Sequence, residues 1–242
     1  MLALHGFTGD GRDFRPLFPL MQRPIFAPDL IGHGEAPPKD VTKYRIDAVA
    51  DSLAEQAKGV VMGYSMGARL AMNLYLRHPQ KIKGLVLISA TPGIANTKRR
   101  VERRRSDEKL ADRIESIGIR AFIEEWNEKP IIASQKRIAR WHRSEMYARR
   151  LRRKTWGLAN SLRGMGTGAM TPLWKSLPDF DLPVLLISGQ EDKKFTRTAQ
   201  KMGERLPNGR VATILGAGHC THLEKPESTC AIIREFLSDI GE

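Results

Sequence analysis

Three residue types that act together in nucleophilic and base catalysis follow separate apolar runs in this chain. Ser65 lies in Gly63-Tyr-Ser-Met-Gly67, a G-x-S-x-G pattern with an apolar run before it and a helical pattern after it. The glycines allow a tight turn, so the hydroxyl of Ser65 is expected to be exposed at the end of a strand. A serine hydroxyl needs a base, and that base needs a carboxylate to orient it.

Later apolar runs supply an acid and a base in the chain order that such a serine requires. The run Val184–Ser188 leads to Asp192, and the run Val211–Leu215 leads to His219. We therefore predict that Asp192 and His219 are the partners of Ser65. The weaker candidates are Glu191, which is next to Asp192, Asp181, which precedes its strand, and His222.

Backbone N–H groups are predicted to stabilise negative charge beside Ser65. The N–H of Met66 lies at the start of the helix that follows the serine. A second donor in this arrangement comes from the loop after an earlier strand. The turn His5-Gly6-Phe7 follows the first apolar run, so we predict the N–H of Phe7 as that donor.

Strand-like runs alternate with helix-like segments, which predicts an α/β fold with a mostly parallel central sheet flanked by helices. The alternation stops between residues 93 and 178, where short arginine-rich amphipathic helices are expected. We predict a core domain of residues 1–92 and 179–242 and a helical cap of residues 93–178. The predicted strands are Met1–Leu4, Pro24–Leu30, Val60–Met62, Lys83–Ala90, Pro183–Ser188 and Arg210–Leu215. The predicted core helices are residues 46–57, Met66–Arg77, Arg197–Leu206 and Pro226–Ile240.

Positive charge is concentrated in the predicted cap. The chain has a net charge of +13, and residues 98–154 hold 19 Lys and Arg against 9 Asp and Glu. An anionic partner is expected to bind there, although many of these side chains fit a solvated helical surface. No apolar run approaches the ~18 residues of a membrane span, and no secretory signal is visible. The two cysteines form no disulfide framework or metal pattern, so we expect a cytoplasmic protein without metal or cofactor.

These motifs resemble the α/β-hydrolase superfamily over nearly the whole chain. Within it, the sequence closely resembles the MenH family, the 2-succinyl-6-hydroxy-2,4-cyclohexadiene-1-carboxylate synthases of menaquinone biosynthesis. The family usually has strand sequence before the His-Gly-Phe turn, whereas four residues precede it here. Either the N-terminal strands are shortened or Met1 is not the true start. The segments that carry the resemblance are Leu4–Asp10, Gly63–Arg69, Glu102–Asp107, Phe122–Trp126, Pro130–Ser134, Gly189–Phe195, Gly218–His222 and Glu224–Pro226.

The resemblance implies a lyase rather than a hydrolase. The family's substrate is a cyclohexene carboxylate that bears succinyl and enolpyruvyl groups, and the enzyme removes a ring proton and expels pyruvate. By this resemblance, Asp192 orients His219, His219 deprotonates Ser65, and the serine oxygen takes the ring proton. The substrate-binding positions of the family match Arg69, Arg103, Arg143, Tyr64 and Trp126, with Arg104 and Arg105 as competitors of Arg103.

Two other functions are open from the sequence. A carboxylesterase with an acyl-serine intermediate uses the same three residues, but it gives no role to Arg69 or the cap arginines. A non-enzymatic protein that binds nucleic acid through the basic cap fits the charge, but it leaves the serine, histidine and aspartate unexplained. We therefore expect a small polycarboxylate substrate and no nucleic acid; the oligomeric state is not predicted. Arg149, in a basic run without a family match, is expected to be an exposed charge.

Overall fold

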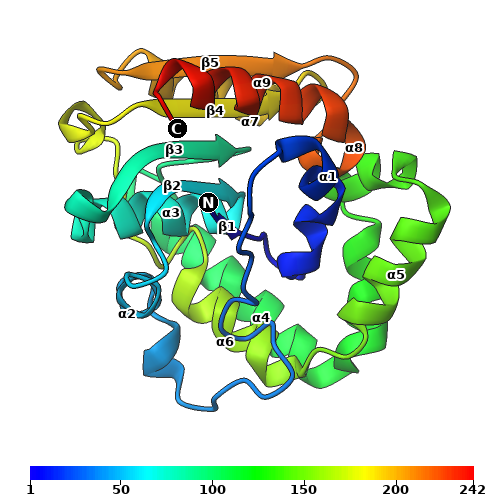
Figure 1. The fold of residues 1–242 in the computed structure, drawn as a ribbon. Helices are drawn as coiled ribbons and strands as arrows, with labels where there is room; N and C mark the ends of the chain where they lie inside the picture. Colours follow the sequence, from blue (N-terminus) through cyan, green and yellow to red (C-terminus); the bar gives the residue numbers. More distant parts are fainter.

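A five-stranded parallel sheet forms the centre of the computed structural model, which describes residues 1–242 (Figure 1). The strands lie in the order β1-β2-β3-β4-β5, and each neighbouring pair is parallel. Their carboxyl ends therefore share one edge, where ligands of such sheets bind. The predicted fold class is confirmed. The strands are β1 (Leu2–Leu4), β2 (Gly59–Tyr64), β3 (Ile82–Ile88), β4 (Val184–Gly189) and β5 (Gly209–Ile214).

Helices cover both faces of the sheet, which is why the central strands are apolar along most of their length rather than alternating. The side chains of Val61, Leu85 and Leu186 pack on one face with helices α2, α3 and α7. Met62 and Ile187 pack on the other face with the segment after β1 and with helices α8 and α9. These elements are a 3-10 helix (Gly11–Leu17), α1 (Phe18–Met21), α2 (Ile46–Ser52), α3 (Met66–Arg77), α7 (Lys193–Gly203), α8 (Thr221–Glu224) and α9 (Pro226–Asp239).

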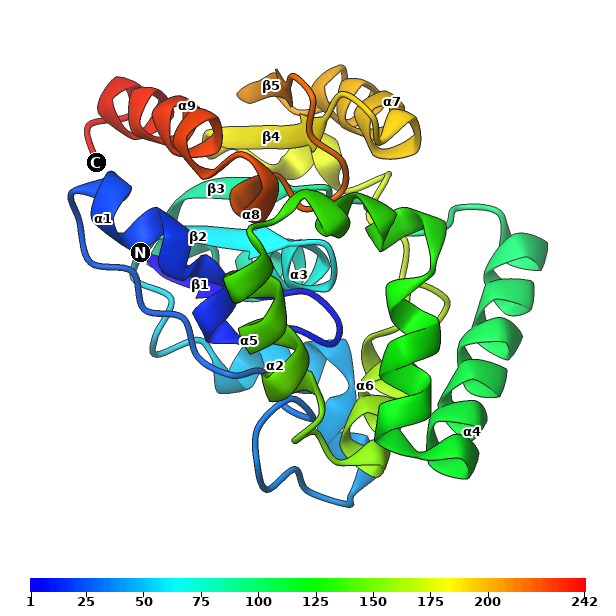
Figure 2. The same cartoon turned by 90° about the vertical axis from the view of Figure 1, so that its right-hand side faces the viewer.

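The chain between β3 and β4 is helical and lies to one side of the sheet (Figure 2). Its elements are α4 (Thr97–Asn127), a 3-10 helix (Pro130–Arg137), α5 (Arg140–Arg150), α6 (Thr155–Met165) and a second 3-10 helix (Leu177–Asp179). The expectation of short helices is wrong for α4, which has 31 residues and breaks only at Gly118, where φ is +81°. A small apolar core that includes Phe122 and Leu158 joins α4 to α6. Treating residues 93–178 as a separate cap domain stays a prediction, and we call this segment the cap.

The strand predicted at Pro24–Leu30 is absent. Only Phe26 forms a bridge beside β1, where its N–H donates to the carbonyl of Met1 at 2.9 Å and its carbonyl accepts from the N–H of Ala3 at 2.8 Å. Pro24 and Pro28 have no N–H and cannot extend this ladder. Helix boundaries also differ from prediction: α2 ends at Ser52, α7 spans Lys193–Gly203 instead of Arg197–Leu206, and α9 ends at Asp239. No helix is long and apolar enough to cross a bilayer.

Candidate active site

Ser65 occupies a sharp turn between β2 and α3. Its backbone has φ of 51° and ψ of −102°, which lies in the region that residues with a Cβ rarely adopt. A Cβ on Gly63 would lie 2.4 Å from the carbonyl oxygen of Gly67, and a Cβ on Gly67 would lie 1.9 Å from that of Leu4. Both positions therefore require glycine, because the start of α3 packs directly on the neighbouring strand ends.

The structure brings Ser65, His219 and Asp192 together at the carboxyl edge of the sheet. The Nε2 atom of His219 lies 3.1 Å from the hydroxyl oxygen of Ser65, and its Nδ1 atom lies 2.5 Å from a carboxylate oxygen of Asp192. The second carboxylate oxygen of Asp192 accepts the N–H of Phe195 at 3.3 Å, which places Asp192 at the start of α7. This arrangement holds the imidazole proton on Nδ1 and leaves Nε2 free to accept the hydroxyl proton.

The weaker sequence candidates do not reach Ser65. His222 stacks on Phe14 with ring centroids 5.0 Å apart, and burial lowers its pKa to about 3, so it is a neutral core residue. Glu191 forms an ion pair with Arg137. Asp181 accepts a hydrogen bond from the hydroxyl of Tyr75. None of these three contacts the hydroxyl of Ser65.

Ser89 supports the histidine and was missed by the sequence analysis. It follows β3 at the same sheet edge, and its backbone φ is 49°. Its hydroxyl is buried and donates to the carbonyl oxygen of His219 at 2.7 Å. The predicted strand Lys83–Ala90 included Ser89, whereas β3 ends at Ile88, so nothing in the sequence marked Ser89 as a residue of this edge. The bond fixes the backbone of the loop that presents His219.

The turn that contains Phe7 is held in place by His5. Nδ1 of His5 donates to the carbonyl of Gly6 at 2.8 Å, and its Nε2 accepts the N–H of Leu30 at 2.9 Å. Burial lowers the pKa of His5 and keeps it neutral, as this bonding pattern requires. The N–H of Phe7 donates no hydrogen bond within the chain, and the N–H of Met66 is the first of α3. Both groups are therefore available to an anion beside Ser65.

A cavity of about 330 Å³ opens beside Ser65, between the sheet edge and the cap. Its apolar wall includes Trp126 and Phe7, whose rings meet edge to face at 5.2 Å. Four of the five predicted substrate-binding residues line it; Arg143 does not. Its polar and aromatic lining residues include Phe7, Tyr64, Ser65, Arg69, Arg103, Trp126, Arg150, Ser161 and His219.

Two arginines face this cavity while buried without a carboxylate partner. Arg69 is 8% exposed and donates only to the carbonyl of Met165, at 2.7 Å. Burial and the nearby charge of Arg103 lower the pKa of Arg69 to about 10, so it stays charged at neutral pH. Arg150 is 7% exposed and donates to the amide oxygens of Asn127 and Gln135, at 3.0 and 3.1 Å. A buried cation is costly unless an anion accompanies it, so these residues favour an anionic ligand.

The other predicted arginines divide into three cases. Arg103 lines the cavity, but it is paired with Asp107 at 2.8 Å. Its competitors Arg104 and Arg105 are exposed and lie outside the cavity. Arg143 does not line this cavity but a separate hollow in the cap, so its predicted contact with substrate stays a prediction that this structure does not support. Arg150 is the α5 arginine that reaches the cavity, and no spacing in the sequence distinguishes it from its basic neighbours.

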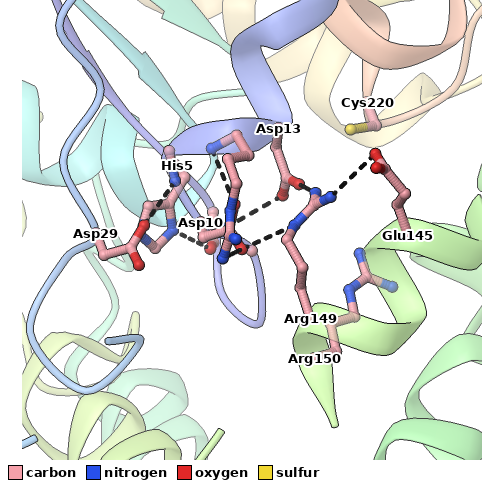
Figure 3. Close-up of polar contacts among 12 residues, drawn as sticks. His5, Asp10, Asp13, Asp29, Glu145, Arg149, Arg150 and Cys220 are labelled. Carbon is pink, nitrogen blue, oxygen red and sulfur yellow. Dashed lines mark hydrogen bonds and ion pairs between the residues drawn. The ribbon is translucent and has the colours of Figure 1, made fainter. Parts of the chain in front are cut away.

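Arg149 is buried, which corrects the expectation that it is an exposed charge. Its Nε lies 2.9 Å from Asp10 and its Nη2 lies 2.7 Å from Asp13 (Figure 3). Arg153 also pairs with Asp10, at 2.5 Å. Burial raises the pKa of Asp10, but its ion pairs, including that with Arg12, outweigh this effect and lower the pKa to about 2. This network joins the end of α5 to the loop that presents Phe7.

We expect Arg149→Ala to lower the free energy of unfolding by about 3–5 kcal/mol, because it leaves two buried carboxylates short of a partner. Urea denaturation of the wild type and the variant measures this change. Arg105→Ala removes an exposed arginine of the same cap and is the matched control, with an expected change within about 0.5 kcal/mol. Equal stability of the two variants would show that the buried ion pairs contribute nothing to folding.

Comparison with known proteins shows similarity over the full chain. The model of the alpha/beta hydrolase family matches residues 1–232. A Bacillus subtilis (strain 168) protein with the provisional name 2-succinyl-6-hydroxy-2,4-cyclohexadiene-1-carboxylate synthase is 38% identical over 248 residues, 99% of this chain and 90% of that protein. The structure of MenH from S. aureus superposes with a TM-score of 0.94 at 28% identity and covers 100% of this chain and 94% of that one. A malate-bound thermophilic esterase from Thermogutta terrifontis superposes with a TM-score of 0.85 at 25% identity, covering 100% and 90%.

Proposed function

The chain belongs to the alpha/beta hydrolase family and, within it, to the 2-succinyl-6-hydroxy-2,4-cyclohexadiene-1-carboxylate synthases, and from this premise we propose that it catalyses their lyase reaction. The family resemblance predicted from the sequence is confirmed. The proposed substrate is 2-succinyl-5-enolpyruvyl-6-hydroxy-3-cyclohexene-1-carboxylate, from which pyruvate is eliminated in menaquinone biosynthesis. The two buried thiols, Cys220 and Cys230, suit a reducing compartment, so the proposal includes a cytoplasmic location.

In the proposed mechanism, Ser65 acts as a base rather than as a nucleophile. His219 takes the hydroxyl proton across the 3.1 Å contact, and Asp192 stabilises the resulting imidazolium. The serine oxygen then removes the ring proton. The electron pair of the broken C–H bond at C2 forms a C2=C3 double bond, and the existing C3=C4 pair moves to C4=C5. The C5–O bond to the enolpyruvyl group then breaks, and pyruvate leaves as its enolate, which takes up the proton held by His219. No bond between Ser65 and the substrate forms.

Negative charge that develops on the succinyl ketone during proton removal is placed beside two backbone donors. The N–H groups of Phe7 and Met66 are the donors, and they are preorganised by the His5 turn and the start of α3. Fixed donors in a cavity shielded from water stabilise a developing anion more than water does. The substrate carboxylates are assigned to Arg69, Arg103 and Arg150.

The observation that carries the proposal is the pair of buried arginines without carboxylate partners, Arg69 and Arg150, in the cavity that holds Ser65. A substrate with several carboxylates supplies the missing charge, and guanidinium groups bind carboxylates through two parallel hydrogen bonds. An esterase for neutral substrates is the second candidate, favoured by the similarity to the Thermogutta terrifontis enzyme. A neutral ester, however, supplies no negative charge to pair with Arg69 and Arg150.

The proposal is tested by adding the enolpyruvyl substrate and measuring pyruvate together with the intact mass of the protein during turnover. We expect stoichiometric pyruvate and no mass increase, because elimination has no acyl group to transfer. A neutral aryl ester is the matched comparison substrate. A stable adduct on Ser65 from the enolpyruvyl substrate, or ester hydrolysis without pyruvate release, would replace the lyase with an esterase.

A further inference from the structure

A second hollow of about 420 Å³ lies in the cap, on the other side of Arg150 from the catalytic cavity. It is bounded by the end of α4, the 3-10 helix Pro130–Arg137 and α5. Three residues, Ile132, Gln135 and Arg150, line both spaces. The residues that line it include Glu128, Ile132, Lys136, Arg140, Arg143, Met146 and Arg150.

The charge around this second hollow is not balanced. Its acid, Glu128, pairs with Lys136 at 2.9 Å, so these two side chains neutralise each other. Arg140, Arg143 and Arg150 have no carboxylate within ion-pair distance. Figure 3 shows the contrast along α5, where Arg149 reaches the carboxylates of Asp10, Asp13 and Glu145, while the adjacent Arg150 reaches none of the carboxylates drawn.

The donors in this hollow are also left unsatisfied. The Nε atoms of Arg143 and Arg150 are buried and have no hydrogen-bond partner in the chain. Unpaired buried donors on cations are costly, which indicates that a ligand completes them. The wall beside the arginines is apolar at Ile132 and Met146, which suits a short carbon chain attached to the anionic group.

We propose that the second hollow binds a small carboxylate of the 2-oxo acid class, held by Arg143 and Arg150. Its planar carboxylate matches the guanidinium groups, and its methyl or methylene carbon packs on Ile132 and Met146. The binding site itself follows from the charges described. The identity of its physiological ligand as the pyruvate released by the enzyme rests on the proposed function.

A ligand in the second hollow affects the catalytic cavity because Arg150 lines both. A carboxylate bound to Arg143 attracts the guanidinium of Arg150 and withdraws it from a substrate carboxylate on the other side. The two ligands then weaken each other's binding by the same factor. Pyruvate is therefore expected to raise the KM for the enolpyruvyl substrate, and the rise is expected to disappear in Arg143→Gln while kcat stays unchanged.

The direct test is calorimetric titration of pyruvate into the full-length wild type, Arg143→Gln and Arg69→Gln. We expect Arg143→Gln to weaken pyruvate binding by about 10-fold or more, because it removes a charge-assisted bond. Arg69→Gln alters only the catalytic cavity and is expected to bind pyruvate as the wild type does. Arg140 is exposed in the same hollow. Arg140→Gln is therefore expected to leave folding unchanged and to weaken pyruvate binding less than Arg143→Gln does.

Several results overturn the proposal. Unchanged pyruvate binding in Arg143→Gln excludes the second hollow as the pyruvate site. Loss of pyruvate binding in Arg69→Gln alone places pyruvate in the catalytic cavity. Inorganic phosphate that binds as tightly as pyruvate with the same dependence on Arg143 contradicts selection for carboxylates. Titration requires no turnover, so a failure of the lyase assay leaves this result intact, and lyase activity without pyruvate binding contradicts only the second site.

Discussion

Ser65→Ala is expected to lower kcat by about 10⁴-fold with the enolpyruvyl substrate and to leave folding intact. The hydroxyl of Ser65 contacts Nε2 of His219 and supports no core packing, so its removal ends proton abstraction without creating a cavity. Loss of one member of a coupled serine–histidine–aspartate set typically has an effect of this size. Pyruvate formation gives kcat, and thermal denaturation checks that Tm is unchanged.

Ser161→Ala is the matched control for this variant. Ser161 contributes a second serine hydroxyl to the same cavity, but it contacts the sulfur of Met66 at 3.5 Å and no histidine. We expect its kcat to stay within a few-fold of the wild type. Retention of more than about a tenth of the activity in Ser65→Ala, or an equal loss in both variants, would contradict the assignment of Ser65 as the base.

The positions of Ser65, Asp192 and His219 were predictable because each follows a strand of the parallel sheet. The carboxyl ends of β2, β4 and β5 lie at one edge, so residues far apart in the chain meet there once the strand order is known. The support from Ser89 was not predictable, since a serine after a strand has no distinctive pattern. Its role depends on a carbonyl 130 positions later in the chain.

The sequence does not predict which partner or cavity each cap arginine reaches. A run of basic residues reveals total charge, but the direction of each side chain depends on how α5 packs. Arg149 turns toward Asp10 and Asp13, Arg150 toward the catalytic cavity, and Arg143 toward the second hollow. The partners of Arg149 lie 139 and 136 positions earlier, so no local pattern signals its burial.

Arg69→Ala is expected to lower kcat/KM for the enolpyruvyl substrate by about 10- to 150-fold, because a charge-assisted hydrogen bond in a closed site contributes roughly 1.5–3 kcal/mol. Arg150→Ala is expected to fall in the same range, since Arg150 is also buried and unpaired. Arg103→Ala is expected to lose less, because Asp107 already neutralises part of its charge. Steady-state kinetics on the three variants measures the order of their losses in kcat/KM.

The stability of the Arg69→Ala variant distinguishes a loss of substrate binding from a general loss of folding. Arg69 has no carboxylate partner, so its removal relieves a desolvation cost, and we expect the free energy of unfolding to change by less than about 1 kcal/mol. That result contrasts with the large loss expected for Arg149→Ala. Arg104→Ala, one position after Arg103 on the exposed side of α4, is the control for charge alone. If Arg104→Ala lost as much activity as Arg69→Ala, the cap would act by diffuse electrostatic attraction, and the assignment of carboxylate sites to Arg69 and Arg150 would be wrong.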